Sequence, residues 1–210
     1  MSGKTLSQSK TVRGIAERAM FKREDLHRLV VEIAGPALER EDEQVRRALE
    51  SNSLYPREGY MGLYWNDNER DYQFLIWKAL VNSNFPFRVE LEKDKRDFTL
   101  FDPTGGAVIG ELKRWYTSGG QGQNLDGIKN DIRERLKEFC PGFMLITTVH
   151  DAGQAKANFD FLAKELGDLG MKREDFEIYT FPTIRFQANN RKTFQFALIG
   201  FIVTEGRSVS

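Results

Sequence analysis

The sequence predicts an α/β protein whose core runs helix, three-strand meander, helix, strand and helix, with more strands at the C-terminal end. Three observations lead to this class. Two strand-like stretches flank DPTGG (102–106), which is typical of a β-hairpin. Apolar residues then recur at helical spacing, at Leu125, Ile128, Ile132, Leu136 and Phe139. Finally, GFMLITTV (142–149) is apolar almost throughout, as in a strand buried on both faces.

A helical N-terminal segment precedes this core. Residues 11–52 carry apolar side chains at helical spacing, and we expect Pro36 to kink or break the helix. The stretch 53–68 is rich in aromatic residues, Gly and Asn, which suggests a linker. We therefore divide the chain into a helical segment, 1–60, and an α/β core domain, 61–210.

The core elements follow in order. A helix is expected over 69–83, with Asp67 or Asn68 as its N-cap. Alternating patterns predict strands, and the apolar helical stripes predict helices. The expected strands are 87–92, 96–102, 107–115, 142–149, 176–186 and 193–203, and the later helices are 124–139 and 152–170.

Composition limits the functional classes. Of the 210 residues, 40% are hydrophobic and 30% charged, and no apolar run approaches the ~20 residues that span a bilayer. The polar first ten residues lack the apolar region of a secretory signal, so we expect a cytoplasmic protein. A single cysteine, Cys140, and two histidines cannot form the usual Cys/His zinc site, which leaves carboxylates as the plentiful metal ligands. The formal net charge of zero argues mildly against a nucleic-acid partner without excluding one.

The pair Glu111 and Lys113 is the strongest candidate for chemistry. Both lie on one face of the expected strand, with Cβ atoms roughly 6.5–7 Å apart. If the turn is centred on Thr104 and Gly105, paired residue numbers sum to about 208–210, and Asp97 lies opposite or next to Glu111. Only an even sum places the two acids directly opposite, and a bulge at Gly110 would re-aim the neighbouring side chains.

Two carboxylates held together repel each other unless a cation lies between them. Hard oxygen ligands of this kind select Mg²⁺, for which Mn²⁺ can substitute. A lysine beside that ion can orient a water molecule and stabilise charge on a phosphate, as phosphodiester hydrolysis requires. Taken alone, however, an acid and a base two residues apart on a strand are usually a solvated ion pair.

The run RDFTLFDPTGGAVIGELKRW (96–115) resembles the PD-(D/E)XK nuclease superfamily, in which an Asp on one hairpin strand is followed by Glu-x-Lys on the next. The resemblance covers residues 66–150 and implies a restriction-endonuclease-like core. It departs from the usual pattern in having Arg96 before Asp97 instead of proline. It implies catalytic roles for Asp97, Glu111 and Lys113.

The same resemblance implies further site residues. In many members an acid on the preceding helix adds a metal contact, and Glu69 occupies that place. The helix after the hairpin often supplies a polar or basic residue, for which Lys129 and, less well, Gln123 are candidates. The chain is accordingly expected to be a Mg²⁺-dependent DNA endonuclease of restriction, defence or repair. A homodimer would allow a cut on each strand, and RNA is not excluded as the substrate.

Other residues admit two interpretations. Arg114 could contact phosphates and Trp115 could stack on a base, although core or rim packing is the commoner role of such an aromatic residue. His27 and His150 are interpreted as structural, since no Ser or Cys nucleophile pairs with either. Because fold and function separate readily, the alternative function is a catalytically inactive nuclease-fold protein that binds nucleic acid or protein.

Overall fold

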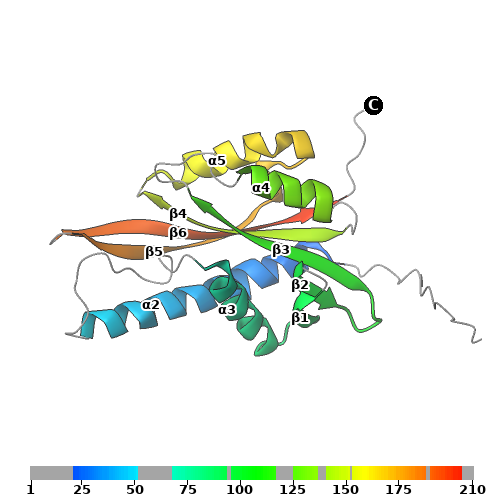
Figure 1. Ribbon diagram of the computed structural model, residues 1–210, viewed down its shortest axis with the longest axis horizontal. Helices are drawn as coiled ribbons and strands as arrows, with labels where there is room; N and C mark the ends of the chain where they lie inside the picture. Colours follow the sequence, from blue (N-terminus) through cyan, green and yellow to red (C-terminus); the bar gives the residue numbers. More distant parts are fainter. Residues whose placement is uncertain are drawn as a thin grey trace, which may run out of the picture.

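The computed structural model describes residues 21–51, 68–93, 96–116, 125–136, 141–151, 153–187 and 190–204. A mixed sheet of six strands, in the order β1-β2-β3-β4-β6-β5, forms its centre (Figure 1). The strands are β1 (Arg88–Lys93), β2 (Arg96–Phe101), β3 (Ala107–Tyr116), β4 (Gly142–Asp151), β5 (Glu177–Gln187) and β6 (Asn190–Val203). The α/β class and the expected position of each strand are therefore confirmed.

Neighbouring strands are antiparallel except for one pair. β3 and β4 run parallel, and the chain between them passes over one face of the sheet as a helix. This crossover is the connection that parallel neighbours require. β4 lies between β3 and β6, and its residues Gly142–His150 are buried, as their apolar sequence predicts.

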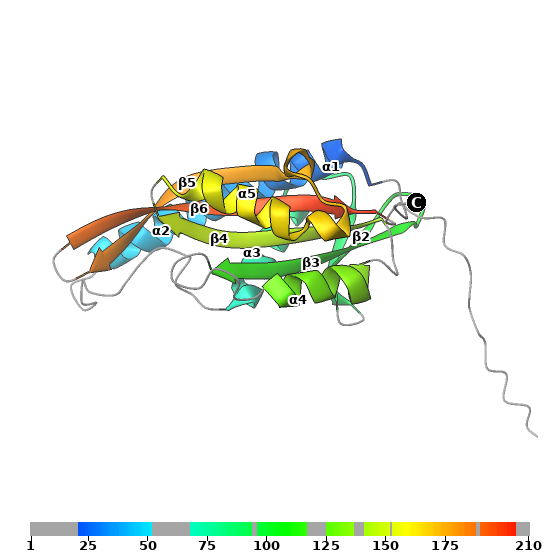
Figure 2. The same cartoon turned by 90° about the horizontal axis from the view of Figure 1, so that it is seen from above.

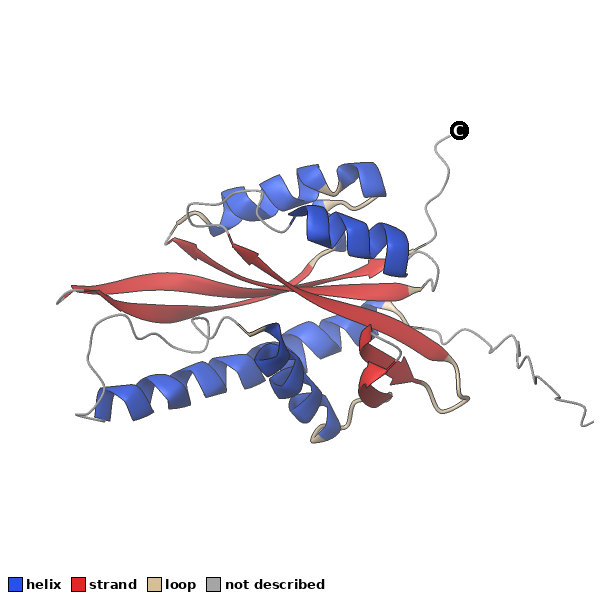
Figure 3. Cartoon of the chain, viewed as in Figure 1, coloured by secondary structure: helices blue, strands red, loops and turns tan. Residues whose placement is uncertain are grey.

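Helices cover both faces of the sheet (Figure 3). One layer contains α1 (Arg23–His27), the π-helical η1 (Arg28–Ala34), α2 (Gly35–Ser51) and α3 (Glu69–Val81). The opposite layer contains α4 (Leu125–Asn130), the π-helical η3 (Asp131–Leu136) and α5 (Ala155–Glu165). Two short 3₁₀ turns, η5 (Gly167–Leu169) and η6 (Arg173–Asp175), lead from α5 to β5. Seen from above, α4 and α5 lie over the sheet and run roughly along its strands (Figure 2).

The N-terminal helix continues through Pro36, so the expected break is wrong. A π-helical turn lies just before the proline, and in it the Gly35 N–H donates to the Val30 carbonyl. Because this turn is wider than an α-helical turn, it gives the proline ring more room beside the carbonyl groups of the preceding turn. Gly35 also lets the helix approach β5 closely, because a Cβ there would lie 2.3 Å from the Tyr179 ring. The N-terminal helices thus share one hydrophobic core with the strands.

Side-chain alternation along β3 assigns its residues to the two cores. Val108 and Leu112 pack in the core beneath α1, α2 and α3, whereas Ile109 and Trp115 pack in the core beneath α4 and α5. Glu111, two residues from Ile109, therefore shares the second face, and so does Lys113. The prediction that Glu111 and Lys113 lie on one face is confirmed.

The β2–β3 hairpin has an even register, with paired residue numbers that sum to 208, as in Phe98 opposite Gly110. Its turn is centred on Thr104, because the Asp102 carboxylate accepts hydrogen bonds from the backbone of Thr104 at 2.8 Å and Gly106 at 2.9 Å. Gly110 pairs without a bulge and is a close-approach glycine instead: a Cβ there would lie 2.1 Å from the Phe143 ring.

Within the described ranges, no helix is long and apolar enough to cross a membrane.

Candidate active site

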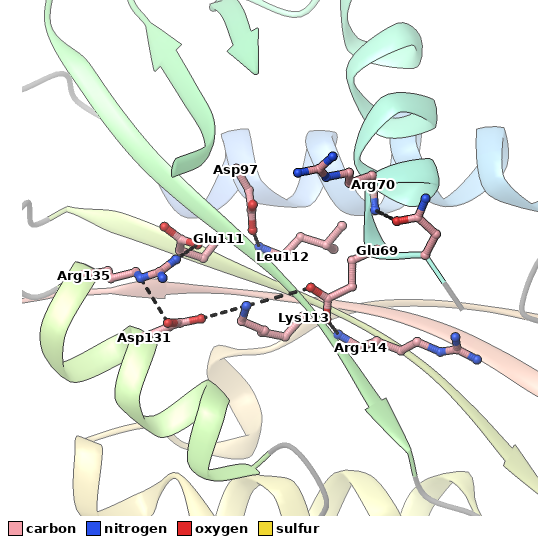
Figure 4. Close-up of polar contacts among 10 residues, drawn as sticks. Glu69, Arg70, Asp97, Glu111, Leu112, Lys113, Arg114, Asp131 and Arg135 are labelled. Carbon is pink, nitrogen blue, oxygen red and sulfur yellow. Dashed lines mark hydrogen bonds and ion pairs between the residues drawn. The ribbon is translucent and has the colours of Figure 1, made fainter. Parts of the chain in front are cut away.

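The edge of β3 is unpaired beyond the first residues of β2, and two carboxylates close it. Ladder pairing between the two strands reaches Phe98 and Gly110, while β3 continues to Tyr116. Beyond that point the Leu112 N–H donates to Asp97 Oδ2 at 2.8 Å, and the Arg114 N–H donates to Glu69 Oε1 at 3.0 Å (Figure 4). The two acids thus take the place of a neighbouring strand. Their hydrogen bonds fix each carboxylate beside a particular residue of β3.

The start of α3 positions Glu69. Asn68 is the N-cap, and its side chain accepts a hydrogen bond from the Arg70 N–H at 3.2 Å. One turn further, the buried Gln73 amide donates to the Asp97 carbonyl at 2.6 Å, which joins α3 to β2. The first helical turn therefore brings Glu69 to the same stretch of β3 as Asp97.

Glu111 is a buried carboxylate with an incomplete set of partners. Its side chain is 0% exposed, and Oε2 accepts a hydrogen bond from Arg135 Nη1 at 3.2 Å. Oε1 has no hydrogen-bond partner among the described residues. Burial and the neighbouring Asp97 carboxylate raise the pKa of Glu111 to about 7, against the opposing effect of Arg135. One oxygen of this buried carboxylate is therefore compensated by Arg135, and the other has no donor from the described residues.

Lys113 is held between two acids. Its ammonium lies 3.1 Å from Asp131 Oδ2 and 3.9 Å from Glu69 Oε2. Burial favours the neutral amine, but the hydrogen bond with Asp131 and the charge of Glu69 outweigh it and raise the pKa of Lys113. Lys113 is thus a charged hydrogen-bond donor at neutral pH and not a proton acceptor.

Asp131 is a site residue that the sequence analysis missed. It lies on η3 and is 8% exposed, with Oδ1 3.3 Å from Arg135 Nε. Asp131 and Arg135 are four residues apart, so they share one face of the helix, the face that covers Glu111 and Lys113. An acid and a base at this spacing in DIRER (131–135) was the available signal, although most such pairs lie on solvated helix surfaces.

A groove of about 400 Å³ opens beside the two edge-closing acids. Arg70 and Arg96 lie on its wall together with Asp97 and Glu69. Arg70 is largely exposed and forms an ion pair with Glu92 at 3.5 Å. Acidic and basic side chains that line one groove suit a ligand that carries both phosphate groups and a bound cation.

The structure does not bring every expected residue to this site. Trp115 is 0% exposed and stacks on Phe161, so its ring has no open face for a base, and the core-packing interpretation holds. Arg114 is also buried, which corrects its expected role at a phosphate-binding surface. Lys129 forms an ion pair with Glu165 on α5 at 2.8 Å. Gln123 lies outside the described residues.

The two histidines have structural partners. His27 Nδ1 lies 2.8 Å from Glu177 Oε2 on β5. His150 is buried, its Nδ1 lies 2.9 Å from the Asn158 amide, and burial lowers its pKa to about 4.

The donor set fits a hard divalent cation. Asp97, Glu111 and Glu69 supply carboxylate oxygens, and the buried Oε1 of Glu111, which has no partner within the described ranges, would be stabilised by added positive charge. In the described part of the chain, however, no three His, Cys, Asp or Glu residues already lie close enough to hold a metal ion. Binding would therefore require the acids to move together. Comparisons of the chain with protein-family models, with curated proteins and with solved structures found no match.

Proposed function

We propose that this protein is a metal-dependent nuclease that hydrolyses phosphodiester bonds in DNA. The observation that carries the proposal is the buried Glu111 carboxylate, whose Oε1 meets no donor among the described residues and whose pKa burial and Asp97 raise to about 7. Asp97 on the facing strand and Lys113 on the same face complete the set. This arrangement is costly for stability, and such costs concentrate at functional sites.

The topology supports a restriction-endonuclease-like core. β1, β2 and β3 form an antiparallel meander, α3 precedes it, and α4 with η3 leads to β4 parallel to β3. The candidate site lies where β2 and β3 stop pairing. Each of these features agrees with the resemblance carried by Asp97, Glu111 and Lys113, so we propose membership of the PD-(D/E)XK superfamily as well.

The proposed metal ligands are Asp97 and Glu111, with Glu69 assisting through Oε2. A bound Mg²⁺ ion supplies charge neutralisation at the phosphate and acidifies a water ligand. The Leu112 N–H keeps Asp97 in place by binding Oδ2, which leaves Oδ1 for the ion. The Arg114 N–H does the same for Glu69 through Oε1.

Lys113 orients the attacking water and stabilises the charge on the phosphate. In the reaction the water oxygen forms a bond to phosphorus, the bond from phosphorus to the leaving oxygen breaks, and a solvent proton reaches that oxygen. The water's own proton passes to solvent, because Lys113 is already charged. Its ammonium is well suited to donate a hydrogen bond to the nucleophile or to a phosphate oxygen.

DNA is the proposed substrate, with Arg70 and Arg96 on the groove wall as contacts for its phosphates. One site cuts one strand, so a cut through both strands requires two copies of the chain or two successive events.

Cleavage assays test the proposal. Plasmid DNA, single-stranded DNA and RNA are incubated with the protein in Mg²⁺, Mn²⁺ or EDTA. We expect DNA cleavage that EDTA abolishes, and a loss of at least ~10²-fold in Glu111→Gln and Lys113→Met. The matched control is Glu165→Gln, which makes the same chemical change at a glutamate in an ion pair outside the site. Cleavage of RNA alone would change the substrate class; equal rates in all variants would refute the nuclease.

A catalytically inactive nuclease-fold protein is the second candidate. The observation that favours it is the ion pair between Arg135 and Glu111, which gives the buried acid an internal cation. In that case none of the three nucleic acids is cleaved under any metal condition, and binding measured by gel shift would be unaffected by Lys113→Met.

A further inference from the structure

Asp131 is a buried acid to which neither metal binding nor attack on phosphate assigns a role. It is 8% exposed, and its two oxygens meet different cations, Lys113 at 3.1 Å and Arg135 at 3.3 Å. Arg135 continues to Glu111 at 3.2 Å. η3 therefore reaches both functional residues of β3, Lys113 through Asp131 and Glu111 through Arg135 (Figure 4).

The contact with Lys113 has a mechanical consequence. A lysine side chain has four rotatable bonds, so its ammonium occupies one place only when partners hold it there. The ion pair with Glu69 is long, at 3.9 Å, whereas the ion pair with Asp131 is close, at 3.1 Å. Asp131 is the nearer partner of Lys113. It lies on η3, whose residues Ile132 and Leu136 pack in the hydrophobic core.

Arg135 explains why Asp131 itself stays in place. The guanidinium is 49% exposed and bridges Asp131 and Glu111, so it ties the anchor to the buried acid. Asp131 is not a good metal ligand in this arrangement, because both of its oxygens face cations that an ion would have to displace.

We propose that Asp131 is a positioning residue that holds the Lys113 ammonium next to Glu111. This inference rests on the proposed nuclease function for its catalytic consequence. Its structural content, that Asp131 restrains Lys113, is independent of catalysis. A misplacement of ~1 Å at a catalytic group is enough to lower a rate by ~10²-fold.

Amine labelling tests the restraint without any reaction. The intact protein receives a short pulse of an amine-reactive acetylating reagent, and mass spectrometry of peptides gives the labelling rate of each lysine. Lys129 is the internal control, because its ion pair with Glu165 leaves it 19% exposed, close to the 24% of Lys113. In Asp131→Asn we expect Lys113 to react at least five-fold faster and Lys129 at its original rate.

Two further variants separate restraint from loosening of the helix. Arg135→Met removes the other partner of Asp131 but keeps its carboxylate, so it should accelerate the labelling of Lys113 less than Asp131→Asn does. Asp131→Glu should restore much of its protection. The proposal is overturned if Lys113 in Asp131→Asn reacts as slowly as in the wild type, or if Lys129 accelerates equally.

Kinetics tests the catalytic consequence. We expect Asp131→Asn to lower kcat by ~10–100-fold, with KM for DNA changed less than two-fold and partial recovery in Asp131→Glu. If the wild type cleaves and Asp131→Asn cleaves at the same rate, the positioning role is wrong while the nuclease stands. If the wild type cleaves no nucleic acid, the proposed function fails, and the labelling experiment alone decides whether Asp131 restrains Lys113.

Discussion

The replacement Glu111→Gln should make the protein more stable while it abolishes the proposed activity. Glutamine keeps the shape of the side chain and removes a charge that the fold buries completely. Because the pKa of about 7 already includes the attraction of Arg135, the neutral amide is a fair substitute for the protonated acid. The expected gain is the free energy of holding this carboxylate ionised.

The size and sign of the gain depend on pH. The pKa of Glu111 is raised from 4.5 to about 7, so the native state binds this proton more tightly than the unfolded state. The contribution of the protonated Glu111 to the free energy of unfolding is therefore fully present below pH 4.5 and declines as pH rises toward 7. The free energy of unfolding loses ~1.4 kcal/mol for each pH unit between the two pKa values. Ionisation of Glu111 therefore lowers stability by about 1 kcal/mol at pH 5 and by about 3 kcal/mol at pH 8.

Urea unfolding in EDTA measures this difference, with tryptophan fluorescence as the probe. Glu111→Gln should exceed the wild type by about 3 kcal/mol at pH 8 and by about 1 kcal/mol at pH 5. The control Glu165→Gln should show no gain at pH 8, because its ion pair with Lys129 lowers the pKa of Glu165. Mg²⁺ or Mn²⁺ should then stabilise the wild type and leave Glu111→Gln unchanged.

The reasoning is refuted if Glu111→Gln is no more stable than the wild type at pH 8 in EDTA. That result would mean that the buried carboxylate is fully compensated in solution. Stabilisation of both proteins by metal, to the same extent, would place the ion elsewhere.

Three further predictions concern the frame of the site. Burial lowers the pKa of His150 from 6.5 to about 4, so the native state resists protonation and stability should fall by about 3 kcal/mol as pH drops through this window; His150→Gln should lose that slope in urea titrations at several pH values. Gly110→Ala should lower stability by ~1–3 kcal/mol by forcing a methyl group into the Phe143 ring, whereas Gly127→Ala on α4 has open space and should be neutral or stabilising in the same titration. Asn68→Ala should remove the cap of α3 and lower stability by ~1 kcal/mol, while Asn68→Asp should retain it, as thermal unfolding would show.

Local patterns were sufficient for the elements of the sheet. The strand patterns at 96–102 and 107–115 correspond to β2 and β3, and the apolar run at 142–149 corresponds to the buried β4. These features depend on contacts close in sequence or on simple burial, which the residue pattern encodes directly. Pro36 was the exception. The helix continues through this proline, directly after a π-helical turn that the residue pattern did not predict.

The partners of the site residues were harder to predict. The position of Asp97 opposite Glu111 follows from the hairpin register, in which paired residue numbers have an even sum. The contacts of Asp131 and Arg135 with β3 depend on how their helix, which is far from β3 in sequence, packs on the sheet. Nothing in the spacing of the two residues distinguishes them from a surface ion pair. Burial of Trp115 likewise depends on α5 covering its face.

The sequence by itself determined the strand order of the hairpin, the shared face of Glu111 and Lys113, and the scarcity of metal ligands other than carboxylates. Only the tertiary structure decided that Glu111 is buried with one oxygen unpartnered by any described residue, and that Asp131 forms an ion pair with Lys113. The physical reason is that periodicity reports which way a side chain points along its own element. Desolvation and ion pairing depend instead on which distant element packs against it.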